Sequence, residues 1–227
     1  MAARDGSPLA ALTSIAACLL ALGLLSPHRA SAAGEPGFGC KHSHRRNAQV
    51  NPNPTGRPPL VIGDSTVLLP IPDLIAAGYS VNARGCRGFR EAVSVAEKIR
   101  RKHRLPHLVL MNDYGNGGVH LDEIQEALAA IGKSRVLGLI TEYDANTGRP
   151  PAPDTDVFFK ARSRYPHRIA VLDWIKYSRA HHKAEPKRGA WFLPDLFHPN
   201  FAGSAAYAQF LSQALPLAED GRFPPLP

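Results

Sequence analysis

The chain is poor in aromatic residues and shows no internal repeat. Aromatic side chains make up 7% of its 227 residues, and they are not interleaved with the basic residues as they are in a nucleic-acid-binding platform. We therefore expect no nucleic acid partner. Charged residues reach only 20%, against 44% hydrophobic residues. This balance excludes a wholly disordered, collagenous or coiled-coil chain.

Acidic residues are also few relative to basic ones. There are 19 Asp and Glu against 27 Lys and Arg, which gives a formal net charge of +8 and a pI of about 9.7. Such a charge favours anionic polymers or surfaces, for example a teichoic-acid-like or acidic-lipid envelope. The length suffices for one compact domain with a hydrophobic core.

The N-terminus has the features of an export signal. Arg4 precedes an apolar run over residues 9–25, and a small-residue cleavage pattern ends at Ala32. We predict that residues 1–32 form a cleaved signal peptide and that the protein is secreted or extracytoplasmic. A retained membrane anchor through 9–25 is the alternative, although the run is short for a span. Lipidation at Cys18 is disfavoured because apolar residues continue past it.

The chain has three cysteines, and cleavage of the signal peptide would leave Cys40 and Cys86. An even number is consistent with one disulfide in an oxidising compartment, although two unrelated thiols would satisfy the sequence equally well. Residues 33–58 contain almost nothing apolar, so we expect a disordered linker there. His42 and His44 in this basic segment are expected to be solvated rather than metal ligands.

From residue 59 onward, short apolar runs alternate with amphipathic stretches, which is typical of βαβ units and a parallel sheet. Predicted strands lie at 60–62, 79–81, 108–111, 136–140 and 169–172. Predicted helices lie at 89–104, 121–131 and 201–215. With right-handed crossovers, these elements make a three-layer α/β/α sandwich around a sheet of about five strands, in one domain over 59–227.

The first candidate functional residue follows the first predicted strand. Gly63-Asp64-Ser65 places a serine hydroxyl at the start of a helical turn, where backbone N–H groups converge. Gly63 permits a tight turn, and negative charge developing beside Ser65 would be favoured there. An ordinary helix cap is the alternative reading.

The second candidate site lies before the last predicted helix. Asp195 and His198 are three residues apart, so the carboxylate can reach Nδ1 of the imidazole and leave Nε2 free to take a proton from a serine. A surface loop with a capping aspartate is the alternative. The combination of an early serine after a strand and a late Asp/His pair is the stronger signal.

These residues resemble the SGNH, or GDSL-type, hydrolases, in which Gly-Asp-Ser follows a strand and Asp-x-x-His precedes a terminal helix. Residues 81–87 are similar to the second block of the family, and residues 114–117 are similar to its Gly-x-Asn-Gly block. Leu172-Asp173-Trp174 adds a likeness to the extracytoplasmic SGNH domains associated with acyltransferases. The resemblance covers about residues 59–216 and implies a flavodoxin-like parallel sheet.

The resemblance also implies roles for individual residues. Ser65 would be the nucleophile, His198 the general base and Asp195 its orienting partner. The oxyanion hole would use the amides of Ser65 and Gly85 and the side chain of Asn116.

Two of these assignments have alternatives within the sequence. Tyr114 stands where the family usually has glycine, and Asn112-Asp113 offers a competing match to Asn116. The amide of Arg84 or Cys86 could replace that of Gly85.

We therefore expect an exported esterase that cleaves O-acyl esters, with an acylated glycan or a small ester as substrate. An O-acetyltransferase with the same acyl-enzyme and an inactive module that binds an anionic envelope polymer are the alternatives. No metal or cofactor is required. His181, His182 and Lys183 are expected in a surface loop, and residues 143–153 in a loop that lines the acyl or glycan pocket.

Overall fold

A computed structural model describes residues 39–53, 55–113, 117–144, 146–148, 155–182 and 189–220. The predicted signal peptide and its alternatives lie outside these residues. Within them, the strands are β1 (Ser43–Arg46), β2 (Leu60–Gly63), β3 (Ser80–Arg84), β4 (Leu108–Asn112), β5 (Val136–Ile140) and β6 (Ile169–Leu172). None of the helices in this part of the chain is long and apolar enough to cross a membrane.

The helices alternate with the strands along the chain. The α-helices are α1 (Ile71–Ala76), α2 (Phe89–Arg101), α3 (Leu121–Ile131), α4 (Thr155–Arg164), α5 (Trp174–His182), α6 (Phe201–Leu211) and α7 (Leu217–Asp220). The described residues also contain two short 3-10 helices, η1 (Ser65–Val67) and η3 (Ser212–Ala214). The predicted helix over 201–215 therefore ends earlier as an α-helix and continues as η3.

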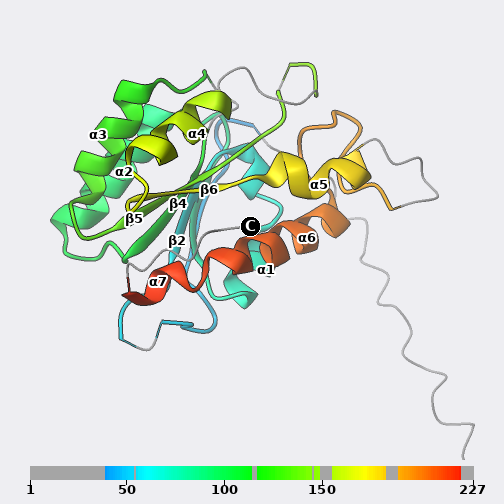
Figure 1. Ribbon diagram of the computed structural model, residues 1–227. Coiled ribbons are helices and arrows are strands. Elements are labelled where there is room, and N and C mark those ends of the chain that lie inside the picture. The colour runs from blue at the N-terminus through cyan, green and yellow to red at the C-terminus, as the bar shows by residue number, and fades with distance from the viewer. Residues whose placement is uncertain are drawn as a thin grey trace, which may run out of the picture. The chain divides into compact units, whose positions relative to one another are not determined.

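The strands form one sheet in the order β1-β3-β2-β4-β5-β6. Neighbours from β3 to β6 are parallel, as expected for strands joined through helices, and β1 pairs with β3 in the antiparallel direction. Helices α2, α3 and α4 lie on one side of the sheet, and α1, α5, α6 and α7 lie on the other (Figure 1). The fold is the predicted three-layer α/β/α sandwich.

Each face of the sheet has its own apolar core because successive side chains of a strand point to opposite faces. In β2, Val61 packs with the cluster that contains the residues of α1, α5 and α6, and Ile62 packs with the cluster under α2 and α3. The central parallel strands are buried on both faces, so they read in the sequence as continuous apolar runs.

Strand β1 differs from the sequence expectation. Ser43–Arg46 lies inside the segment that we predicted to be a disordered linker, and that prediction is wrong for these residues. All four side chains are exposed. An edge strand of this kind is held by backbone hydrogen bonds to one neighbour, so it carries no apolar pattern that sequence analysis can detect.

Candidate active site

Ser65 lies directly beyond the carboxyl end of β2, in the first residue of η1. The Asp64 side chain caps this turn, because its Oδ1 accepts hydrogen bonds from the N–H of Thr66 at 2.9 Å and from its Oγ1 at 2.7 Å. A Cβ at Gly63 would lie 2.2 Å from Cγ2 of Val67. The close turn that presents Ser65 therefore requires glycine at position 63.

His198 and Asp195 lie in the loop before α6. Asp195 Oδ1 accepts hydrogen bonds from the N–H groups of Phe197 and His198, at 2.9 and 3.0 Å. Its other oxygen, Oδ2, lies 2.7 Å from Nδ1 of His198. Local hydrogen bonds thus fix the carboxylate against the imidazole ring.

The two segments meet across 133 positions of the sequence. His198 Nε2 lies 2.9 Å from Ser65 Oγ, so Asp195, His198 and Ser65 form one continuous hydrogen-bonded chain. Burial alone would raise the pKa of Asp195, but the hydrogen bonds from Phe197 and His198 outweigh it and lower the pKa. The carboxylate is therefore ionised at neutral pH, and it favours a proton on Nδ1.

The Gly85 amide, which we predicted to stabilise an oxyanion, is used elsewhere. Its N–H donates to the carbonyl oxygen of His42 at 2.9 Å, next to β1, so it is not free to bind a ligand. The next residue, Cys86, has a φ of +56°, and among the described residues its N–H has no hydrogen-bond partner. The same holds for the N–H of Ser65. Cys86, one of the alternatives, is therefore the better candidate donor.

A disulfide joins Cys86 to Cys40. It ties the turn after β3 to the residues that precede β1, and the hydrogen bond from Gly85 to His42 ties the same two segments. The disulfide and the antiparallel strand together hold the turn in place.

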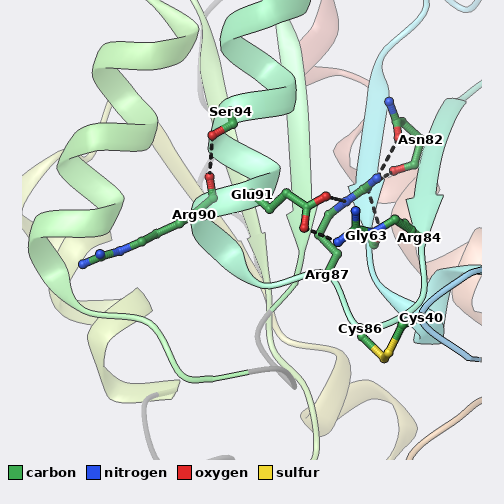
Figure 2. Close-up of polar contacts among 9 residues, drawn as sticks. All are labelled: Cys40, Gly63, Asn82, Arg84, Cys86, Arg87, Arg90, Glu91 and Ser94. Atoms are coloured by element: carbon green, nitrogen blue, oxygen red, sulfur yellow. Dashed lines mark hydrogen bonds and ion pairs between the residues drawn. A yellow bond between two sulfur atoms is a disulfide. The ribbon is translucent and has the colours of Figure 1, made fainter.

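Arg87 directly follows this turn and connects β3 with β2 (Figure 2). Its guanidinium is buried and donates to the carbonyl oxygens of Gly63, at 3.0 Å, and of Asn82. It also donates to Oδ1 of Asn82 at 2.9 Å. Glu91 in the first turn of α2 pairs with Arg84 and lies 4.0 Å from Nε of Arg87. Arg87 thus links the carboxyl end of β2, which precedes Ser65, to β3, which precedes Cys86.

Asn112, the alternative to Asn116 as the oxyanion donor, instead supports the turn that carries Ser65. It pairs with Gly63 across β2 and β4, and its Nδ2 donates to Oγ1 of Thr66. Its side chain is buried, so it does not face open space beside Ser65. Asn116 and Tyr114 lie outside the described residues.

Three buried carboxyl groups lie beneath the serine turn: those of Asp64, Asp113 and Glu142. The Thr66 hydroxyl is within hydrogen-bond distance of both Asp64 and Glu142, at 2.7 and 3.0 Å. One hydroxyl proton can serve only one carboxylate, so the second contact calls for a protonated carboxyl group. Burial accordingly raises the pKa of Asp64 to about 6, and burial together with the charge of Asp64 raises that of Asp113 well above its usual value.

The predictions for His181 and His182 need correction. His182 belongs to α5 and is buried, stacked on Tyr143 with ring centroids 3.7 Å apart. His181 lies in the last turn of the same helix and stacks on Trp191. The surface-loop prediction is therefore wrong for both, because their rings pack as aromatic groups. Lys183 lies outside the described residues.

The predicted pocket loop begins at Tyr143, which is buried in the core. Residues 145 and 149–153 of that loop lie outside the described part of the chain. Among the described residues, no group of three or more His, Cys, Asp or Glu side chains is arranged to hold a metal ion.

Comparison with solved structures finds other proteins with a similar architecture. The C-terminal catalytic domain of Streptococcus pneumoniae peptidoglycan O-acetyltransferase A superposes with a TM-score of 0.54 and 20% identity, over 71% of this chain and 93% of that one. A GDSL-like lipase from Bacteroides thetaiotaomicron gives 0.47 and 14%, over 70% and 88%. A member of the lipolytic G-D-S-L family from Veillonella parvula gives 0.48 and 13%, over 67% and 94%.

At these identities the similarity defines the fold alone. No protein-family model matches the sequence, and no curated protein matches it.

Proposed function

We propose that this protein is an exported carboxylic ester hydrolase that removes O-acyl groups, such as acetyl groups, from a cell-envelope glycan or a small ester. The observation that carries the proposal is the hydrogen-bonded chain from Asp195 through His198 to Ser65. Export is supported by the apolar N-terminal run over residues 9–25 and by the disulfide, which suits an oxidising compartment.

In this mechanism, Ser65 Oγ attacks the carbonyl carbon of the ester while His198 Nε2 takes the hydroxyl proton. Asp195 holds the ring and stabilises the imidazolium that forms. The negative charge on the carbonyl oxygen is met by the N–H groups of Ser65 and Cys86 and by the side chain of Asn116. His198 then returns the proton to the leaving alcohol, which leaves an acyl group on Ser65.

Water completes the reaction in the hydrolase. His198 takes a proton from the water as its oxygen attacks the acyl carbon, and returns that proton to Ser65 as the carboxylic acid departs. In an O-acetyltransferase, a sugar hydroxyl would attack in place of water. The likeness to the peptidoglycan O-acetyltransferase domain favours this second candidate, which uses the same residues.

The proposal is tested with p-nitrophenyl acetate as substrate, with and without a soluble glycan acceptor. We expect acetate release by the wild-type protein and its loss in Ser65→Ala with the circular dichroism spectrum unchanged. Acetylated glycan as the main product would favour the transferase. A folded wild-type protein that neither releases nor transfers acetate from p-nitrophenyl acetate, acetylated xylan or peptidoglycan would favour the non-catalytic binding module.

A further inference from the structure

A second candidate site lies at the amino ends of the strands, whereas Ser65 lies beyond the carboxyl end of β2. It is a cavity of about 540 Å³ bounded by the first residues of β3, the last turns of α2 and the segment that begins with β1. Leu60 and Ser80, at the amino ends of β2 and β3, line it. Ser65 and Cys86 instead follow the carboxyl ends of these strands. We call this cavity the basic groove.

Three separate segments bring cations to the basic groove: β1, the residues before β2, and the end of α2 with the residues after it. Among the residues that the structure describes, six Lys or Arg residues line it and no acidic residue does: Arg45, Arg46, Arg57, Lys98, Lys102 and Arg104. All six are exposed, and none of them forms an ion pair with a carboxylate in the part of the chain that the structure describes.

The C-terminal dipole of a helix explains a preference for Lys98 and Lys102 at the end of α2. It does not explain the convergence of Arg45 and Arg57 from other segments on the same cavity. Like charges gathered in this way repel one another, so the arrangement suits a bound anion.

The lining between the cations is mostly apolar. Leu60, Val95 and Ile99 contribute to it, and Asn82 adds a polar group. Asn82 is buried, and its Nδ2 has no hydrogen-bond partner among the described residues. The groove therefore offers apolar surface and a rim of positive charge.

We propose that the basic groove binds the acidic units of an anionic polysaccharide, away from the reacting serine. Arginine pairs with carboxylate and phosphate groups through two parallel hydrogen bonds, so both uronate and phosphate substituents fit the rim. The apolar lining suits the faces of sugar rings. In the described part of the chain no aromatic side chain lines the groove, which argues against stacked nucleic acid bases.

The link to catalysis rests on the proposed function: a polymer held in the groove would be the glycan that carries the ester. Binding itself requires no chemistry at Ser65. The groove would raise the local concentration of a polymeric substrate, and it would leave the hydrolysis of a small ester unchanged.

The test measures binding of polygalacturonate and of phosphomannan to the full protein by calorimetry, at low and moderate salt. Lys98→Glu combined with Lys102→Glu should weaken binding of at least one of these glycans roughly tenfold or more, since each reversal replaces attraction with repulsion. The matched control is Lys160→Glu with Arg164→Glu, which reverses two exposed cations four residues apart on α4. The control should change the Kd by less than about threefold.

Arg57→Ala with Arg104→Ala provides a second test should the charge reversals unfold the protein. Hydrolysis of p-nitrophenyl acetate should be equal in all variants, and only the KM for an acetylated acidic glycan should rise. Equal losses in the groove and control variants would overturn the proposal. So would a lack of binding to both glycans, or tighter binding of duplex DNA. A wild-type protein that binds the glycan through the groove but cleaves no ester would overturn the proposed function alone.

Discussion

The Gly85 N–H donates to the carbonyl oxygen of His42 at 2.9 Å, and one residue later Cys86 forms a disulfide with Cys40. These two links fasten the turn after β3 to the segment that leads into β1. In the mechanism proposed above, the same turn presents the Cys86 N–H to the developing oxyanion. Strand β1, at one edge of the sheet, is therefore linked through this turn to the proposed oxyanion site beside Ser65.

Reduction of the disulfide should lower both stability and activity. The bridge spans 46 positions, and closing a loop of that length in the unfolded chain corresponds to about 4 kcal/mol in the chain-entropy model. We expect the melting temperature and the kcat for p-nitrophenyl acetate to fall in dithiothreitol. Cys40→Ser combined with Cys86→Ser should reproduce the loss and should not respond to the reductant. Unchanged kcat in the reduced, folded protein would show that the disulfide is not needed to position the turn that carries Cys86.

Substitution of Arg87 should be far more damaging than substitution of Arg84. Arg87→Ala leaves the carbonyl groups of Gly63 and Asn82 without their buried donor, and we expect a loss of about 3 kcal/mol or more in the free energy of unfolding. Arg84 is half-exposed, so Arg84→Ala should cost less than about 1 kcal/mol. Urea denaturation of the two variants checks this order. Equal losses would show that the buried guanidinium is not the main link between β2 and β3.

Asp64 should make the stability fall as the pH rises through the acidic range. Its pKa is raised from 3.8 to about 6 in the folded protein, so the folded state holds a proton more tightly than the unfolded state between these values. Stability is therefore lost as the pH rises from about 4 to about 6, by an amount on the order of 3 kcal/mol.

Asp64→Asn removes this titration and keeps a carbonyl oxygen to cap η1. Melting temperatures from pH 4 to pH 7 should show that the variant is stabilised relative to wild type more at pH 7 than at pH 4. A constant difference across this range would contradict the assignment. Asp113 contributes in the same direction, because its pKa is also raised.

Asn116→Ala should lower kcat, whereas Asn112→Ala should mainly lower stability. Removal of one oxyanion donor typically costs about 10²–10³ in rate, so Asn116→Ala should lose that much kcat with little change in stability. Asn112→Ala instead removes the donor to Thr66 and should lower the melting temperature. If kcat is unchanged in Asn116→Ala and falls strongly in Asn112→Ala, Asn112 and not Asn116 is the oxyanion donor.

Local patterns in the sequence predicted the parts of the molecule that depend on local interactions. The apolar run before Gly63 predicted β2 and the turn at Ser65. The three-residue spacing of Asp195 and His198 predicted their contact, because such a spacing closes within one turn of chain. The meeting of His198 with Ser65 was inferred from a family resemblance, since no local pattern encodes it.

What the sequence did not reveal depends on contacts between distant segments. Strand β1 has no apolar residue and is defined only by its pairing with β3. The roles of Asn112 and Arg87 follow from the register of β2 against its two neighbours. One signal was available for Asn112: it ends a strand, as Gly63 does, and polar residues at the carboxyl ends of adjacent parallel strands meet at one edge of the sheet.

The most direct test of the account is covalent labelling with a fluorophosphonate, because the reagent reports the nucleophilicity of a serine without a choice of substrate. We expect one adduct per protein, on the peptide that contains Ser65. His198→Ala should slow labelling by orders of magnitude, and Ser65→Ala should abolish it. No adduct on the folded wild-type protein, or an equal labelling rate in His198→Ala, would contradict the proposed triad.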